Sequence, residues 1–254
     1  MTDSSTAIAA PPAVSVVVPV NNEAENIPPL LAEIEAAMQG RPPFEVVFVN
    51  DGSIDDTEAV LNQLMASRPW LRQIMHDRAS GKSAALRSGV RAARAQIIVI
   101  LDGDGQNNPA DIPVMIDALD PGGSSVGLVN SVRIGRKDTG FKRFQSRVAN
   151  RIRVALLRDG TRDSVSGLKA FPRDVFLSLP FFDGLHRFMP ALVRREGLEL
   201  RQVEVIDRPR QHGRSHYGMW NRLWVGIFDL FCVWWLIRRR KHVPEVTEVN
   251  SNAR

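Results

Sequence analysis

Cysteine is almost absent from this chain: among 254 residues, Cys232 is the only one. A single thiol cannot close an intramolecular disulfide, so the chain is not a small domain held together by disulfides. The first residues, MTDSSTAIAAPPA, also lack the basic segment and apolar core of a secretory signal. Together these absences predict a cytoplasmic location.

Several phosphate-binding and hydrolase motifs are missing as well. Gly81-Lys82-Ser83 resembles the end of a P-loop, but His76 stands where a P-loop needs its first glycine. No G-x-G-x-x-G follows the first apolar run, and Ser166 and Ser215 lack the G-x-S-x-G frame of a hydrolase nucleophile. The histidines are scattered, which argues against a zinc site. The sequence thus excludes a Walker-type nucleotide hydrolase and argues against a dinucleotide dehydrogenase or a serine hydrolase.

Basic residues are in excess. Lys and Arg number 33 against 28 Asp and Glu, which gives a formal charge of +5 and a sequence pI near 10.0. Such a charge suits an anionic partner: nucleic acid, lipid headgroups or a phosphorylated substrate. Because no helix-turn-helix or zinc-finger pattern is present, we do not expect nucleic acid. The polar ends, residues 1–12 and 242–254, are expected to be disordered.

Apolar runs of strand length alternate with helix-like segments over the first hundred residues. The runs are continuous, which is typical of strands buried on both faces of a sheet. Strand–helix alternation predicts an α/β fold with a mostly parallel sheet flanked by helices. The expected strands are Val14–Val20, Phe44–Asn50 and Gln96–Asp102, and the expected helices are Ala24–Gln39, Asp56–Ser67 and Gly81–Ala95.

Polar clusters lie at the ends of three of these strands, where ligands bind in open α/β sheets. They are PVNNE (19–23), NDGSIDD (50–56) and DGDGQNN (102–108). In the last cluster, two aspartates and a glutamine amide provide the hard oxygen ligands that Mg²⁺ or Mn²⁺ prefers, and the intervening glycines permit a turn that aims them at one point. An isolated D-x-D can also be only a turn.

Taken in order, these segments resemble glycosyltransferase family 2. The later segments DSVSGLKAF (163–171), HRFMPAL (186–192) and RQHGRSHYG (210–218) resemble the dolichol- and polyprenyl-phosphate sugar transferases. The resemblance covers residues 14–240. It implies a GT-A type, Rossmann-like fold and a metal-dependent, inverting transfer of a sugar from a GDP- or UDP-sugar to a polyprenyl or dolichyl phosphate.

The resemblance also implies roles for individual residues. The nucleotide sugar would contact Pro19, Glu23, Asp51, Lys82 and Asp102. The metal site would consist of Asp102, Asp104 and Gln106, with the last two as direct ligands. The acceptor phosphate would be held by Arg133, Lys142, Ser146, Arg210 and Ser215. Catalysis would involve Asp104, Asp163 and Arg210, where Asp163 orients the acceptor or a sugar hydroxyl, acts as a base, or merely caps a loop.

The chemistry of such a transferase agrees with these side chains. A polyprenyl monophosphate is partly dianionic at neutral pH, because its second pKa is about 6, and is already a nucleophile. The protein then has to align the reactants, neutralise phosphate charge and provide a metal at the leaving group. The sequence does not name the sugar or the nucleotide. The alternatives are a family 2 enzyme with a non-lipid or polysaccharide acceptor, and a non-catalytic nucleotide-binding membrane scaffold.

The last apolar segment predicts membrane contact. LWVGIFDLFCVWWLI (223–237) would form a helix about 22 Å long, short of the ~30 Å hydrocarbon core. Its tryptophans and the basic run 238–241 favour a helix lying in the interface, and a basic stripe within 139–158 would add to it. We therefore expect a transferase domain over 13–218 and, over 219–241, a peripheral helix on the cytoplasmic face of the membrane. A core or oligomer-interface helix is the alternative.

Overall fold

The computed structural model describes residues 11–119, 125–134, 151–208 and 219–240, and of residues 219–225 it describes the backbone only. The described residues form a seven-stranded sheet with the order β3-β2-β1-β4-β6-β5-β7. The strands are β1 (Val14–Val20), β2 (Phe44–Asp51), β3 (Leu71–His76), β4 (Ile97–Ile100), β5 (Val126–Ile134), β6 (Lys169–Pro172) and β7 (Glu199–Ile206).

Six of these seven strands run in one direction. Strand β6 is antiparallel to both of its neighbours, β4 and β5, whereas every other neighbouring pair is parallel. The mostly parallel α/β sheet expected from the sequence is therefore confirmed. The reversed β6 was not part of that expectation.

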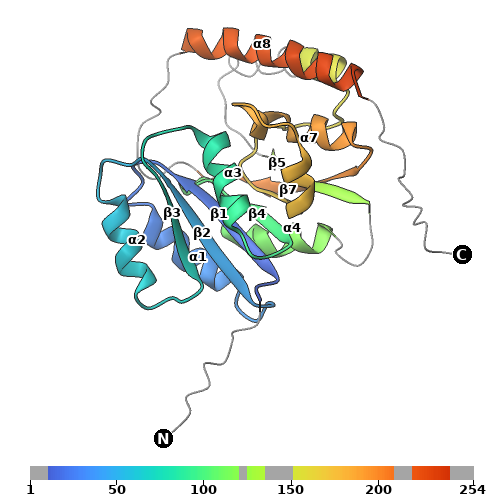
Figure 1. Ribbon diagram of the computed structural model, residues 1–254. Coiled ribbons are helices and arrows are strands. Elements are labelled where there is room, and N and C mark those ends of the chain that lie inside the picture. The colour runs from blue at the N-terminus through green and yellow to red at the C-terminus, as the bar shows by residue number, and fades with distance from the viewer. Residues whose placement is uncertain (1–10, 120–124, 135–150, 209–218, 241–254) are drawn as a thin grey trace, which may run out of the picture.

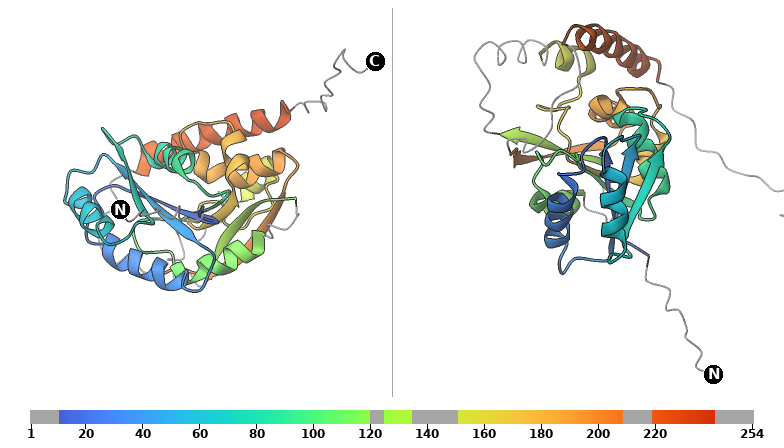
Figure 2. Two further views of the ribbon diagram at one scale, coloured as in Figure 1. Left: turned by 60° about the horizontal axis from the view of Figure 1, so that its bottom comes forward. Right: turned by 90° about the vertical axis from the view of Figure 1, so that its left-hand side faces the viewer.

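Helices cover both faces of this sheet (Figure 1). One face carries α1 (Ile27–Ala37), α2 (Thr57–Met65), the 3-10 turn η1 (Pro109–Asp111) and α4 (Ile112–Leu119). The other face carries α3 (Lys82–Ala92), α6 (Arg173–Ser178) and α7 (Leu185–Arg195). Helix α8 (Met219–Arg238) packs on α7 as an outer layer (Figure 2). Residues 151–157 are also helical.

The central strands are apolar along their whole length because both of their faces are buried. Val16 and Val18 pack into the cluster under α1, α2 and α4, whereas Val17 between them packs under α3 and α7. All three are fully buried. Successive side chains of a strand point to opposite faces, so a continuous apolar run is what a two-sided sheet needs.

The ends of the elements differ slightly from the sequence expectation. The first helix begins at Ile27 rather than Ala24, with Pro28 in its first turn, where a missing N–H is tolerated. Strand β4 ends at Ile100, because it pairs with β1 only as far as Val17. Asp102 therefore lies in the loop beyond the strand rather than within it.

The strand order places the loops after β1 and β4 beside each other. From β1 the chain moves through β2 to β3 on one side, and it then returns to place β4 on the other side of β1. At such a reversal, open α/β sheets bind ligands beyond the carboxyl ends of the two strands. The segments 19–23 and 102–108 both lie at this point of the fold.

We expect Gly89→Ala to destabilise the protein by about 1–3 kcal/mol, because it overpacks the contact between α3 and the sheet. A Cβ at Gly89 would clash with Val17 Cγ1 and lie 2.8 Å from Val49 Cγ2. Gly226→Ala on α8 is the matched control, since a Cβ there meets nothing within 4 Å. Urea unfolding measures both changes, and equal stability of the two variants would contradict this packing.

Candidate donor and acceptor site

The loop after β4 is a tight turn pressed against β1. A Cβ at Gly103 would lie 2.6 Å from Val20 Cγ1 and 3.1 Å from the Pro19 carbonyl oxygen, so only glycine fits there. The backbone N–H of Gln106 donates to Asp104 Oδ1 at 3.2 Å, which closes the turn. The side chains of Asp102, Asp104 and Gln106 are all half-buried. The turn thus brings the three proposed metal ligands together on one short loop.

Residues that the sequence analysis did not single out hold this loop in place. Asn107 is buried; its Oδ1 accepts from the backbone N–H of Asp102 at 3.3 Å, and its Nδ2 donates to Asp207 Oδ1 at 3.4 Å. Arg208 donates its backbone N–H to the Gln106 carbonyl at 2.9 Å and its guanidinium to Glu33 at 2.7 Å. The end of β7 therefore anchors the loop to α1.

Asp102 is held from two sides. Lys82, the first residue of α3, donates its ammonium to Asp102 Oδ1. Gly167 packs against the same carboxylate: a Cβ there would overlap Asp102 Oδ2 and lie 2.5 Å from Asn107 Oδ1. The position of Asp102 therefore depends on α3 and on the 163–168 loop at once.

The donor set fits a hard divalent cation that shares its coordination with a substrate. No group of three or more His, Cys, Asp or Glu side chains within the described ranges is placed to hold a metal by itself. Asp102 and Asp104 offer carboxylate oxygens, and the Gln106 side-chain amide has no hydrogen-bond partner among the described residues. Mg²⁺ is commonly bound by one or two carboxylates plus substrate phosphates, which matches this incomplete protein shell.

Asp51 is occupied by the loop that leads into α3. It is only 6% exposed, and its two oxygens accept from the backbone N–H groups of Ser80 at 2.9 Å and Gly81 at 2.8 Å. The His76 ring lies 2.6 Å from Oδ1 as well. In this arrangement Asp51 holds the start of α3, and its contact with a base stays a prediction.

The loops after β1 and β2 are joined to each other. Asn22 donates its backbone N–H to Ser53 Oγ at 2.9 Å, and Glu23 donates its own to Thr57 Oγ1 at 3.1 Å. Pro19 is partly exposed at the end of β1. These contacts hold Glu23 beside the first turn of α2, while the Pro19 carbonyl lies against Gly103 of the Asp102 loop.

A second charged cluster lies near the first. Arg133 at the end of β5 makes a bidentate pair with Asp163, with Nε–Oδ2 at 2.6 Å and Nη2–Oδ1 at 3.0 Å. Asp207 Oδ2 lies 3.5 Å from Nη1 of the same arginine. Since Asp207 also contacts Asn107, a continuous polar chain links this cluster to the Asp102 loop.

The Asp163 carboxylate is strongly held in its ionised form. Burial by itself raises the pKa of Asp163, but the hydrogen bonds and positive charge of Arg133 outweigh burial and lower it below its usual value. A carboxylate with a lowered pKa is a poor proton acceptor at neutral pH. The geometry favours the orienting role of Asp163 over the role of a base.

Four residues of the expected acceptor site cannot be placed. Lys142, Ser146, Arg210 and Ser215 lie outside the described residues, as does most of the expected basic segment 139–158.

A family model agrees with the arrangement. Residues 15–179 match the model of glycosyl transferase family 2, and this range includes the Asp102 loop and the Arg133–Asp163 pair but not Asp207. The chain belongs to glycosyltransferase family 2.

Named relatives of this family 2 chain transfer sugars to lipid phosphates. It is 31% identical over 229 residues to a dodecaprenyl-phosphate galacturonate synthase from Rhizobium johnstonii, covering 88% of this chain and 67% of the relative. It is 33% identical to an undecaprenyl-phosphate 4-deoxy-4-formamido-L-arabinose transferase from Pseudomonas savastanoi, covering 85% of this chain and 64% of the relative. The chain therefore spans about two thirds of the length of these relatives.

Solved structures share the fold of the family 2 chain. A glucosyl-3-phosphoglycerate synthase from Mycobacterium tuberculosis, solved with Mn²⁺, UDP and glucosyl-3-phosphoglycerate, has a TM-score of 0.66 at 22% identity and covers 90% of this chain and 80% of its own. A mannosyltransferase from Pyrobaculum calidifontis, solved with GDP-Man and Mn²⁺, has a TM-score of 0.63 at 24% identity and covers 93% and 67%.

We expect Asp163→Asn to lower the stability of this family 2 chain by about 1–3 kcal/mol at pH 7, because it leaves the largely buried Arg133 with only its longer contact to Asp207. Since the pKa of Asp163 is lowered in the fold, its contribution is complete above the unfolded value near 3.9 and is lost as the pH falls through the folded value. The difference in unfolding free energy between wild type and D163N should therefore become smaller below about pH 4.

Glu204→Gln is the matched control for this pair. It breaks the Arg162–Glu204 pair, whose side chains are 78% and 59% exposed, so the loss should stay below about 1 kcal/mol. Chemical unfolding as a function of pH measures both variants. A gap between wild type and D163N that stays constant down to pH 3 would show that Asp163 is not the titrating partner.

Proposed function

We propose that the protein transfers a sugar from a nucleotide-diphosphate sugar to a polyprenyl phosphate, with inversion and with the help of a divalent metal. The observation that carries this proposal is that relatives matching 85–88% of the chain are named as polyprenyl-phosphate sugar transferases. The two named sugars, galacturonate and a formamido-arabinose, differ, so the sugar is not assigned. The product would be a lipid-linked sugar donor for cell-envelope glycans.

The donor side of the proposed reaction uses the loop after β4. Asp102, Asp104 and Gln106 would hold Mg²⁺ or Mn²⁺ against the diphosphate, and the metal would neutralise the leaving nucleotide. Lys82 stands at the amino end of α3, where backbone N–H groups also favour phosphate. The solved structures of similar fold that contain Mn²⁺ with UDP or GDP-Man support a divalent metal beside the nucleotide.

The acceptor side uses the cluster around Arg133. Asp163 fixes the plane of the Arg133 guanidinium through two parallel hydrogen bonds. The third nitrogen, Nη1, lies 3.5 Å from Asp207 Oδ2, so an acceptor phosphate would share or replace this longer contact. The acceptor phosphate is already anionic near neutral pH and needs no strong base, which agrees with the lowered pKa of Asp163. Lys142, Ser146, Arg210 and Ser215 would complete this pocket.

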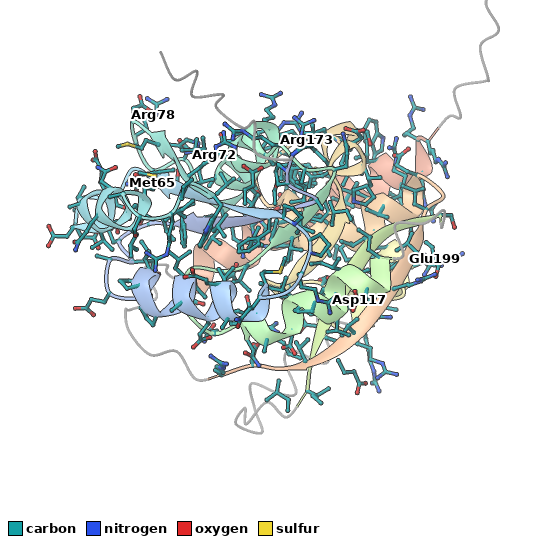
Figure 3. The ribbon with its side chains drawn as sticks, turned by 90° about the horizontal axis from the view of Figure 1, so that it is seen from below. Met65, Arg72, Arg78, Asp117, Arg173 and Glu199 are labelled. Atoms are coloured by element: carbon teal, nitrogen blue, oxygen red, sulfur yellow. The ribbon has the colours of Figure 1, made fainter. Side chains whose placement is uncertain are left out.

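We expect Asp104→Asn to lower sugar transfer by at least ~10²-fold while leaving the protein folded, because it removes a charged metal ligand. Asp117→Asn is the matched control: this carboxylate lies on α4 (Figure 3) and pairs with the exposed Arg41 rather than with any residue of the proposed site. Purified protein, Mn²⁺ and a short polyprenyl phosphate would be offered a panel of UDP- and GDP-sugars, and release of nucleoside diphosphate would be scored.

A parallel reaction with 3-phosphoglycerate as acceptor separates the lipid acceptor from a soluble phosphate. Transfer only to the soluble acceptor would replace the lipid proposal, and full activity of D104N would remove the metal from the mechanism. A protein that binds nucleotide but transfers nothing with any donor would support the scaffold alternative.

Helix α8 carries the proposed membrane contact. Its outward residues Phe228, Phe231 and Trp235 are more than half exposed, whereas Val233 on the inner side is buried. Arg238 lies over the Trp234 ring at 4.3 Å from its centroid, at the end of the helix. An apolar helix with aromatic and basic residues at its end suits the headgroup region of an anionic membrane.

The length of α8 exceeds the expected apolar segment. The helix covers 20 residues, Met219–Arg238, which is more than the 15-residue apolar stretch 223–237 and lies within the expected membrane-associating segment 219–241. Even so, none of the described helices combines the length and the apolar character that a membrane crossing requires. We propose that α8 lies in the interface of the cytoplasmic leaflet, which would hold the site near the phosphate of a membrane-embedded polyprenol.

We expect the variant F228S/F231S/W235S to bind anionic vesicles at least ~10-fold more weakly than wild type, because these side chains form the outward apolar face. Cys232 is exposed on α8 and is the only cysteine, so a polarity-sensitive dye on it reports membrane contact directly. Ile54→Ser is the control, because Ile54 is 94% exposed on a loop of the sheet domain.

Unchanged vesicle binding of the triple variant would refute the interface helix. If the triple variant instead turns a dimer into a monomer in sedimentation, α8 is an oligomer contact rather than a membrane contact.

A further inference from the structure

Lys169 is a buried cation that the site described above does not use. It begins β6 and is 1% exposed, although lysine side chains are rarely buried without a charged partner. Its ammonium donates to Asn130 Oδ1 at 2.7 Å, to the Ser164 carbonyl at 3.2 Å and to the Ser166 carbonyl. All three acceptors are neutral oxygens, so none of these hydrogen bonds is an ion pair.

The number of acceptors matches the charged form of the side chain. An ammonium group has three N–H donors, and each finds one acceptor here. A neutral amine has two, so loss of the proton would leave one carbonyl facing a lone pair. The geometry therefore ties the three contacts to the charge on Lys169.

These contacts fix the loop between the two halves of the site. The loop starts at Asp163, whose backbone carbonyl accepts from Asn130 Nδ2 at 2.7 Å. It ends near Gly167, which packs directly against the Asp102 carboxylate. Lys169 holds the two carbonyls between these points, and Asn130 bridges Lys169 to Asp163.

Charged groups from four parts of the fold face Lys169. The pKa of Lys169 is lowered from 10.5 to about 7, and burial is the largest cause. Lys82 on α3 and Arg133 on β5 contribute to this lowering, whereas the carboxylates of Asp163 and Asp102 oppose it. His186 on α7 also faces this lysine; its pKa lies well below 6.5, chiefly through burial, so it is neutral near pH 7.

We propose that Lys169 is a positioning residue for sugar transfer, whose ammonium group holds the 163–168 loop so that Asp102 on the donor side and the Arg133–Asp163 pair on the acceptor side keep a fixed separation. It touches neither substrate and acts only through the loop. This inference rests on the proposed function. Its consequence is that transfer falls when Lys169 loses its proton.

The test compares Lys169→Met with wild type in the full chain over pH 6 to 9. At pH 6 the variant should show kcat/KM at least ~10²-fold lower, because the loop is no longer held. As the pH rises through about 7, wild type loses the same clamp, so the ratio of wild type to variant should shrink by about tenfold per pH unit. Glu45→Gln is the control. The Glu45 carboxylate is also buried and accepts from Ser15 and Arg72, but it lies at the opposite end of the sheet. The ratio of wild-type to E45Q kcat/KM should therefore stay constant with pH.

A second readout is independent of activity. Because the pKa of Lys169 is lowered in the fold, unfolded chains bind one more proton between pH 7 and 10, and the stability of wild type should rise with pH relative to K169M over that window. Unfolding midpoints at pH 7, 8 and 9 measure this. If K169M does not fold, Lys169→Arg replaces it: its guanidinium stays charged, so its activity should persist to pH 9.

The outcomes separate the two proposals. Wild-type protein that transfers no sugar from any donor overturns the proposed function. The role of Lys169 is overturned if wild-type protein transfers sugar but its kcat/KM does not fall as the pH rises through about 7. It is also overturned if the ratio of wild-type to K169M kcat/KM does not change with pH. Either result leaves the proposed transferase function intact.

Discussion

The close contact between Gly167 and Asp102 is the constraint on which the rest of the site depends. Strand β4 alone could place Asp102 only approximately, because pairing with β1 stops at Ile100 and the aspartate follows in a loop. The carboxylate becomes fixed when a chain segment 65 residues further along the sequence packs against it. No larger residue than glycine permits that approach, so the donor loop and the 163–168 loop are one structural unit.

The fold was largely predictable from the sequence, and the site only partly. The runs Val14–Val20 and Phe44–Asn50 are apolar on both faces, and such strands leave little choice of architecture. The reversed β6 was not predictable, since its four residues are too few to show a periodicity. The Arg133–Asp163 pair and the buried Lys169 were not predictable for another reason. Arg133 and Asp163 are 30 residues apart, and Lys169 is 39 residues from its partner Asn130, so only tertiary packing brings these side chains together.

The charges of the site explain why a metal and a diphosphate would be expected to bind together. Two cations among the described residues of the site already have a carboxylate: Lys82 has Asp102, and Arg133 has Asp163. A divalent ion placed beside Asp102 would meet the Lys82 ammonium at short range and be repelled. Phosphate oxygens placed between the metal ion and the Lys82 ammonium would offset that repulsion. A metal that arrives together with the nucleotide would therefore bind more favourably than a metal that arrives before it.

A chain of direct contacts also joins helix α8 to the loop that carries Asp102. Helix α8 packs on α7, and the N-terminal end of α7 is tied to α3, because Gly184 donates its backbone N–H to Ser83 Oγ at 3.1 Å. Ser83 directly follows Lys82, which holds Asp102. The His186 ring lies 2.8 Å from the same hydroxyl and stays neutral, so this junction adds no charge beside the cation. A displacement of α8 would therefore reach the donor carboxylate through only two packed elements, α7 and the first turn of α3.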